Sequence, residues 1–203
     1  MLRILVTVLL LVAAPARADD GWRRVDLEDG ILVETRDVEG LSIHEVRATT
    51  HTGATPRAIL AVLWHHEEQP SFLPHLRHLE VLRDAPDERL LYEQISLPIL
   101  KDRDVVLRTR RSLDAATGVV DIDSRSVTGE GPPPSAQFIR VRASAGHWHL
   151  VPGAHGGAEV TYTIRTDVGG VVPGWIANRV QRETVPRLVR VILDRAVATV
   201  PAP

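Results

Sequence analysis

Cysteine is absent from this sequence of 203 residues. Without cysteine the chain forms no disulfide, holds no metal through thiolates and carries no lipid on a cysteine behind a cleaved leader. A cysteine nucleophile is excluded as well. Lysine is almost absent too, because Lys101 is the only one, and we draw no function from the predominance of arginine.

A long apolar run is also missing from the N-terminus. Residues 4–14 are apolar, which is well short of the roughly 20 residues that a membrane-spanning helix requires. Arg3 precedes this run and Ala16-Arg17-Ala18 follows it, an order typical of a secretory signal peptide. The alternative, a membrane anchor, would need a longer run. We therefore predict a signal peptide over residues 1–18 and one domain over residues 19–203, located in the periplasm or outside the cell.

Strong charge and familiar catalytic motifs are lacking. The formal net charge is −2, which argues against a nucleic-acid partner, because such proteins normally carry a strongly basic face. Neither a Gly-x-Ser-x-Gly nucleophile motif nor a glycine-rich phosphate loop is present. We therefore expect no catalytic residue and no cofactor.

Histidines are grouped at two places in the chain. Four of them follow one another closely around residues 65–78, but no carboxylate-histidine motif of a zinc hydrolase accompanies them. His147 and His149 alternate around Trp148, so they share the face of a strand opposite that ring. Two imidazoles alone are weak evidence for a metal, and we expect no metal site.

Short segments of alternating polarity dominate what is present, and glycine, proline and aspartate separate them. Thr55 and Pro56 are typical of the cap and first position of a helix. Residues 67–78 contain Pro70 and Pro74, which rules out one continuous helix there. The predicted strands cover residues 31–38, 43–50, 78–83, 89–96, 103–113, 119–127, 137–144, 147–151 and 158–165.

A long amphipathic helix is predicted to begin near Pro173. Gln181 and Thr184 fall within its apolar arc, where an unpaired buried polar group costs roughly 1 to 3 kcal/mol. They therefore either find partners in the sheet or contact a ligand. The remaining members of the arc are Ala177, Val180, Val185, Leu188, Ile192 and Ala196.

These elements predict an α+β fold in which a long antiparallel sheet is covered by the C-terminal helix. Such a sheet is apolar on one face and needs a cover. A sheet of this many strands curled around one helix tends to leave a cavity between them. An apolar cavity of that kind is a ligand site by default.

Three stretches of the sequence resemble START (steroidogenic-acute-regulatory-related lipid-transfer) domains. They are DRDVVLR at residues 102–108, IRVRA leading to WHLVP at residues 139–152, and VTY followed by DVGGVVPGWIAN at residues 160–178. The resemblance spans the predicted mature chain in order and spacing. It implies the helix-grip fold, a curved antiparallel sheet wrapped around a long C-terminal helix with a lipid-sized tunnel between them.

The hairpin of residues 89–113 is the best candidate for the cavity lining. We predict that Glu93 pairs opposite Arg108, which the resemblance matches to an acid and an arginine in the cavity of cholesterol-binding members. The alternative is a structural salt bridge across two strands. The predicted ligand-binding residues are Leu91, Glu93, Ile95, Val106, Arg108, Trp175, Gln181, Thr184 and Leu188.

A gate is expected where the hairpin loop meets the start of the terminal helix, because these segments form the tunnel mouth in the family. We expect Ile99 and Leu100 to contact a membrane or an incoming lipid, and ordinary packing under the helix is the alternative. Gly169, Gly170 and Val171 belong to the predicted gate. Residues 167–172 are predicted to form its hinge, because the two glycines permit backbone angles closed to other residues. Residues 175–185 would then open as a lid, unless the helix is simply kinked and never opens.

The sequence thus predicts a monomeric, non-catalytic protein that binds a lipid or other apolar ligand. Transfer of this ligand is an additional hypothesis. The ligand would be sterol-like or a phospholipid, and contact with a membrane would be transient. The alternative is an enzyme of the polyketide cyclase/aromatase type, since such enzymes share the helix-grip fold. A third hypothesis is a scaffold protein whose cavity is collapsed.

Overall fold

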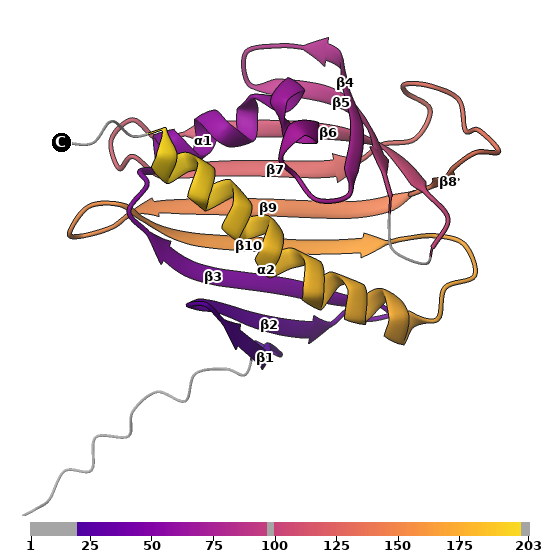
Figure 1. Cartoon of the computed structure of the whole chain (residues 1–203), viewed down its shortest axis with the longest axis horizontal. Helices are drawn as coiled ribbons and strands as arrows, with labels where there is room; N and C mark the ends of the chain where they lie inside the picture. Colours follow the sequence, from indigo (N-terminus) through magenta and orange to yellow (C-terminus); the bar gives the residue numbers. More distant parts are fainter. Residues whose placement is uncertain (1–19, 97–99, 200–203) are drawn as a thin grey trace, which may run out of the picture.

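The computed structural model describes residues 20–96 and 100–199. Its main feature is a large, mostly antiparallel sheet (Figure 1). In spatial order the strands are β1 (Arg23–Glu28), β2 (Ile31–Asp37), β3 (His44–Thr52), β10 (Ala158–Asp167), β9 (Ala143–Pro152), β7 (Val120–Ser126), β6 (Arg103–Leu113), β5 (Glu88–Ile95) and β4 (Leu76–Asp84). The short β8 (Ile139–Arg140) pairs with β6 in parallel.

Three helical segments accompany the sheet in the described part of the chain. They are α1 (Pro56–Trp64), the 3-10 helix η1 (His66–Ser71) and α2 (Gly174–Ala198). Thr55 caps α1 by accepting a hydrogen bond from the Ala58 amide, and Pro56 begins it, so the predicted start of this helix is confirmed. None of the three combines the length and hydrophobicity that crossing a bilayer demands.

The C-terminal helix α2 runs diagonally across one face of the sheet (Figure 1). Val185, Val189 and Ile192 from α2 join one core with residues of the central strands, among them Val120, Ile122, Trp148 and Leu150. We call the face that carries this core the inner face and the opposite one the outer face. The α+β helix-grip architecture expected from the sequence is confirmed.

The predicted strand boundaries are wrong over residues 137–151. Two strands divided at Gly146 were expected, whereas β9 runs unbroken through that glycine and only the two residues of β8 precede it. Gly146 stays in the strand because β9 is paired with β7 on one side and β10 on the other. The Tyr162 side chain also covers the position, since a Cβ on Gly146 would lie 3.5 Å from its hydroxyl. The exposed edge strand β1 was not predicted.

Candidate ligand pocket

Two adjoining pockets lie between the inner face of the sheet and the helices. The first has a volume of about 270 Å³ and reaches from α1 and η1 across strands β4 to β10. The second, of about 210 Å³, lies under the first half of α2. Both are lined by Pro74, Ile95, Val141, Ile164, Thr166 and Leu188.

The pairing of β5 with β6 decides which side chains of this hairpin face the pocket. Glu93 lies opposite Val105, and Leu90 lies opposite Arg108. The predicted pairing of Glu93 with Arg108 is therefore wrong by three positions. Because side chains alternate between the two faces, an odd shift moves Arg108 away from the face of Glu93.

Arg108 belongs to an ion cluster on the outer face. Its guanidinium bonds the Glu130 carboxylate and lies 3.6 Å from the Glu88 carboxylate. Val106 is also on the outer face, where it packs with Leu90 and Tyr92. Neither Val106 nor Arg108 lines either pocket, so both were misplaced by the predicted register.

Glu93 is the acidic group of the first pocket. Its side chain keeps some accessible surface, but that surface faces the pocket, since the residue lies deep among Leu91, Ile95 and Val105. Its carboxyl group makes no hydrogen bond or ion pair within the described residues. Burial alone raises its pKa from 4.5 to about 7, because a charged group loses hydration there. Near neutral pH this carboxyl group can donate or accept a hydrogen bond.

Tyr162 provides a second polar group on the wall of the same pocket. Its ring stacks on Trp148 with centroids 4.2 Å apart, and its hydroxyl has no hydrogen-bond partner in the described part of the chain. The pKa of Tyr162 is raised by burial and further by the negative charge of Glu93. The phenol therefore stays protonated and is available as a hydrogen-bond donor.

Other polar side chains of the first pocket satisfy one another. The Thr109 and Ser124 hydroxyls lie 2.9 Å apart, and the Ser144 and Thr166 hydroxyls lie 2.8 Å apart. Gln69 donates its amide to the carbonyl of Leu63. Glu93 and Tyr162 differ from these side chains, because neither has a hydrogen-bond partner among the described residues.

The second pocket contains the two polar residues of the α2 arc. Thr184 donates its hydroxyl to the Val180 carbonyl at 2.8 Å, within its own helix. Gln181 is 6% exposed, and neither its amide nitrogen nor its oxygen has a partner. The sequence left two outcomes for Gln181, a partner in the sheet or contact with a ligand. Within the described chain, a partner in the sheet is excluded.

Arg103 forms the base of the second pocket and is 2% exposed. Its guanidinium donates to the carbonyls of Lys101 and Val168 rather than to a carboxylate. Burial lowers the pKa of Arg103. Arg103 therefore gives the second pocket, which Gln181 also lines, a buried cation bonded to carbonyl oxygens.

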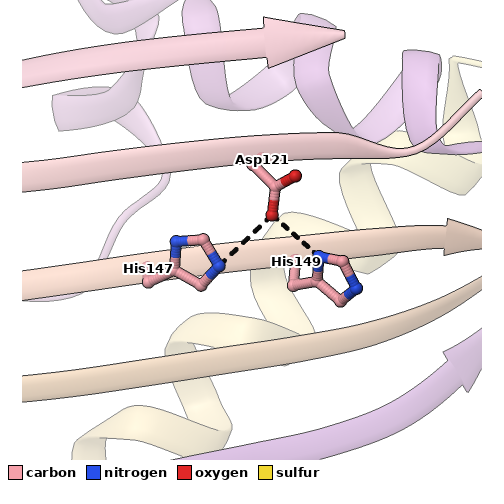
Figure 2. Close-up of side chains that lie close together, drawn as sticks. All are labelled: Asp121, His147 and His149. Atoms are coloured by element: carbon pink, nitrogen blue, oxygen red, sulfur yellow. Dashed lines mark hydrogen bonds and ion pairs between the residues drawn. The ribbon is translucent and has the colours of Figure 1, made fainter. Parts of the chain in front are cut away.

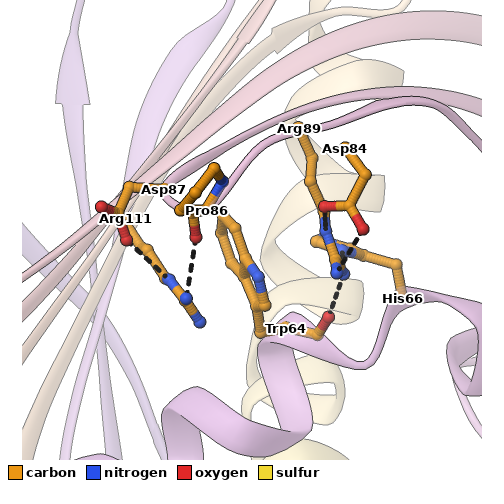
Figure 3. A network of polar contacts seen from close by, with 7 residues as sticks. All are labelled: Trp64, His66, Asp84, Pro86, Asp87, Arg89 and Arg111. Atoms are coloured by element: carbon orange, nitrogen blue, oxygen red, sulfur yellow. Dashed lines mark hydrogen bonds and ion pairs between the residues drawn. The ribbon is translucent and has the colours of Figure 1, made fainter.

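A polar network joins the end of α1 to β5 and β6 (Figure 3), and its member His66 lines the first pocket. The Trp64 ring lies between the guanidinium groups of Arg89 and Arg111, at 5.1 and 4.4 Å. Arg89 also bonds the Asp84 carboxylate at 2.7 Å and meets His66 Nδ1 at 3.1 Å. Burial and the charge of Arg89 lower the pKa of His66 to about 4, so a neutral imidazole faces the pocket.

The remaining predicted residues occupy different positions. Leu91, Glu93, Ile95 and Leu188 line the first pocket, and Gln181, Thr184 and again Leu188 line the second. Trp175 lines neither and is 68% exposed at the start of α2. Whether any of these residues binds a ligand stays a prediction.

The predicted gate is only partly described. Gly169 and Gly170 have φ angles of 65° and 72°, a region that favours glycine, and their role as a hinge stays a prediction. Val171 is fully exposed, and Leu100 is half-buried. Ile99 lies outside the described residues.

Tyr162, Arg103 and His66 line the pockets but were not predicted from the sequence. Tyr162 was assigned to a strand, and the alternation of that strand together with Val160 in the core could have placed it on the inner face. Nothing in the sequence distinguishes the buried Arg103 from the exposed arginines around it. The position of His66 depends on packing against β5.

A sheet gripping a terminal helix around an apolar pocket is the arrangement that the START resemblance implies, and the family model named START domain matches residues 7–198. The chain belongs to the START domain family. The uncharacterized protein PA1579 of Pseudomonas aeruginosa is 28% identical over 176 residues, which cover 86% of each chain. The STAR-related lipid transfer protein of Xanthomonas axonopodis has a TM-score of 0.80 and 26% identity, covering 88% of this chain and 99% of that one.

More distant structures share the START fold. Human STARD10 has a TM-score of 0.78 and 19% identity, over 90% of this chain and 75% of that one. The Zhui aromatase/cyclase of Streptomyces sp. R1128 has a TM-score of 0.51 and 17% identity, over 76% and 91% of the two chains. These two likenesses concern the fold alone.

Proposed function

We propose that this START domain binds one lipid or similar apolar molecule across the two pockets. The observation that carries the proposal is the unpaired carboxyl group of Glu93 in an apolar wall. An unpartnered buried polar group is costly in an empty protein. A ligand hydroxyl or carbonyl would provide the missing hydrogen bond, and the apolar body of the ligand would lie against Leu91, Ile164 and Leu188.

The size of the pockets supports a single, moderately large ligand. Ligand pockets are typically on the order of 300–1,000 Å³, and each pocket alone lies below that range, whereas the two together fall within it. Removal of apolar ligand surface from water provides most of the affinity, at roughly 25 cal/mol per Å². The unpaired amide of Gln181 and the cation of Arg103 offer a second polar end.

Native mass spectrometry of the protein tests this function. The delipidated protein is incubated either with cholesterol or with phosphatidylcholine vesicles, and the mass of the complex identifies what is retained. Ile164→Trp places a large ring where the two pockets meet and should abolish retention. Thr163→Trp is the matched control, because Thr163 belongs to the outer face of the same strand.

The two variants separate a pocket ligand from a surface ligand. Retention by wild type and by the Thr163 variant, with loss in the Ile164 variant, supports the proposal. Equal retention by all three proteins would place the lipid outside the pockets and contradict it. Retention of neither probe by the wild type would contradict the proposal for both sterol-like and phospholipid ligands.

A second candidate function is proton-transfer catalysis of the aromatase/cyclase type. The pKa of Glu93, about 7, suits a group that gives and takes protons near neutral pH, and Tyr162 lines the same pocket. A likeness in fold to an aromatase/cyclase is a weak argument for activity. Incubation with a linear poly-β-keto substrate decides the matter. Formation of an aromatic product that disappears in Glu93→Gln favours catalysis, whereas release of the unchanged substrate favours binding.

A further inference from the structure

Two aspartates and two histidines form a compact group on the outer face of the sheet, away from the pockets. In the pairing of β7 with β9, Asp121 lies opposite His149 and Asp123 lies opposite His147. Their sequence neighbours Ile122 and Trp148 point into the pocket. Alternation along each strand therefore places all four polar side chains on the outer face.

The side chains of Asp121, His147 and His149 converge on one point (Figure 2). The Asp121 Oδ1 atom lies 2.7 Å from His149 Nδ1 and 3.3 Å from His147 Nε2. One ligand atom from each of the three residues falls within a spread of 4.8 Å. The two imidazole rings lie nearly parallel, with centroids 6.2 Å apart.

Asp123 orients the His147 ring through the ring nitrogen that does not face Asp121. Its Oδ1 atom lies 3.1 Å from His147 Nδ1, which turns Nε2 of the same ring toward Asp121. Histidines that bind metals almost always donate their other ring N–H to a carboxylate, a carbonyl or water, and this contact fixes the tautomer. A simple ion pair between one histidine and one aspartate does not need this second carboxylate.

We propose that Asp121, His147 and His149 bind a divalent transition-metal ion, with Asp123 as the positioning residue of His147. Two imidazole nitrogens and one carboxylate oxygen suit Zn²⁺, Co²⁺ or Ni²⁺. Bond lengths of about 2.0 to 2.2 Å require the ligand atoms of Asp121 and His149, now 2.7 Å apart, to separate slightly, and the most widely spaced ligand atoms to approach one another. The half-exposed histidine side chains have room for this, and water would occupy the remaining coordination positions.

The sequence predicted no metal site at this position. His147 and His149 were identified on one face, but the third ligand is 28 residues from His149 in the sequence. Only the register of β7 against β9 brings Asp121 between the two rings. The site also differs from the pocket in its chemistry, so its test is independent of the proposed lipid binding.

Titration of the whole protein with Zn²⁺, followed by calorimetry, tests the site, and the visible absorption of bound Co²⁺ reports the coordination geometry. We expect one ion per chain and a cobalt spectrum of nitrogen and oxygen ligands. His147→Ala combined with His149→Ala should abolish binding. Asp123→Asn should retain the stoichiometry but weaken the affinity by about 10- to 100-fold, as loss of an outer-shell carboxylate does.

His51→Ala is the matched control, because His51 is an exposed strand histidine whose Nε2 lies 3.5 Å from Glu159 without a second imidazole. The His51→Ala variant should bind the metal with the affinity and stoichiometry of wild type. Unchanged binding in the double histidine variant would assign the ion to other histidines and overturn the proposal. An absence of both heat and cobalt absorption at millimolar metal would overturn it as well. Should the double variant fail to fold, selective broadening of the two imidazole signals of wild type by Co²⁺ decides the same question.

Discussion

At the scale of single residues, Glu93 is the group whose chemistry depends most on its surroundings. Its pKa is raised to about 7 in the folded chain. Between pH 4.5 and pH 7 the folded state holds a proton that the unfolded state releases. The contribution of Glu93 to the free energy of unfolding is therefore complete at low pH and is lost as the pH rises through 7. Arg108 does not change this, because it lies on the other face.

Replacing Glu93 by glutamine should make the empty protein more stable at pH 8. The ionised carboxylate of wild type costs on the order of 3 kcal/mol there, at about 1.4 kcal/mol per pKa unit, and the amide avoids that cost. Urea unfolding at pH 5 and pH 8 measures the difference, with the exposed Glu67→Gln as control. If the stability of wild type and that of Glu93→Gln depended on pH in the same way, the carboxyl group of Glu93 would not be buried in solution.

His66 acts in the opposite direction over a similar pH range. Its pKa falls from 6.5 to about 4, so the folded state binds fewer protons than the unfolded state between these values. The contribution of His66 is complete above pH 6.5 and is lost as the pH falls through 4. The effects of Glu93 and His66 on stability offset one another in wild type. A single pH curve of wild type therefore does not isolate Glu93, whereas a comparison with Glu93→Gln does.

Gln181 is the second residue whose substitution should be informative. Its buried amide has no partner, so Gln181→Leu should raise the stability of the empty protein by about 1 to 3 kcal/mol. Thr184→Val is the control, because it removes a hydroxyl that is already bonded within the helix. If thermal unfolding instead shows a loss of stability in the leucine variant, the amide must have a partner in solution.

At the scale of elements, the first turns of α2 are attached to β3 by specific contacts. Asn178 accepts a hydrogen bond from the His44 amide at 2.8 Å and donates one to the Ser42 carbonyl at 3.3 Å. Gly174 permits this approach, since a Cβ there would lie 2.4 Å from the Ser42 carbonyl oxygen. A lid formed by residues 175–185 must break these contacts to open, while Pro186 lowers the helical hydrogen bonding at its other end.

Asn178→Ala should therefore loosen the lid. We expect faster hydrogen exchange in residues 175–185 and faster ligand uptake and release, because local opening costs less free energy than global unfolding. Stopped-flow transfer of a fluorescent lipid measures the exchange rate. Arg179→Ala, which removes only an exposed pair with Glu183, should leave it unchanged. Equal rates in all three proteins would favour a kinked helix that stays closed.

The β5–β6 hairpin marks the limit of what strand periodicity predicts. Alternation identified both strands and gave nearly the correct ends for each. The register of β5 against β6 depends on which backbone hydrogen bonds form across the pair, and that choice leaves no period in the sequence. An error of three positions keeps each strand in place but assigns Val106 and Arg108 to the wrong face.

At the scale of the whole molecule, the order of the helices and strands could be predicted from the sequence because it depends on local signals. The cap at Thr55, the glycines at 169 and 170 and the apolar arc of the last helix each act within a few residues. The pocket was harder to predict, since Tyr162, Arg103 and His66 reach it through contacts between distant segments. The same holds for Asp121, which pairing brings to His147 and His149.

Export of the protein remains a proposal at this scale. The signal peptide expected over residues 1–18 lies outside the described residues. We predict cleavage after Ala18, so that N-terminal sequencing of the protein from the extracytoplasmic fraction begins at Asp19. Recovery of the uncleaved chain in the membrane fraction would instead indicate an anchor.

The four tryptophans lie in different surroundings, and this gives the protein its own optical reporters. Trp148 stacks on Tyr162 at the pocket wall, whereas Trp22 and Trp64 lie beneath arginine guanidinium groups and Trp175 faces solvent. Iodide should therefore quench the emission of Trp175, and a ligand in the pocket should change that of Trp148. With Trp175 replaced by phenylalanine, intrinsic fluorescence can follow occupancy of the pocket without any attached dye.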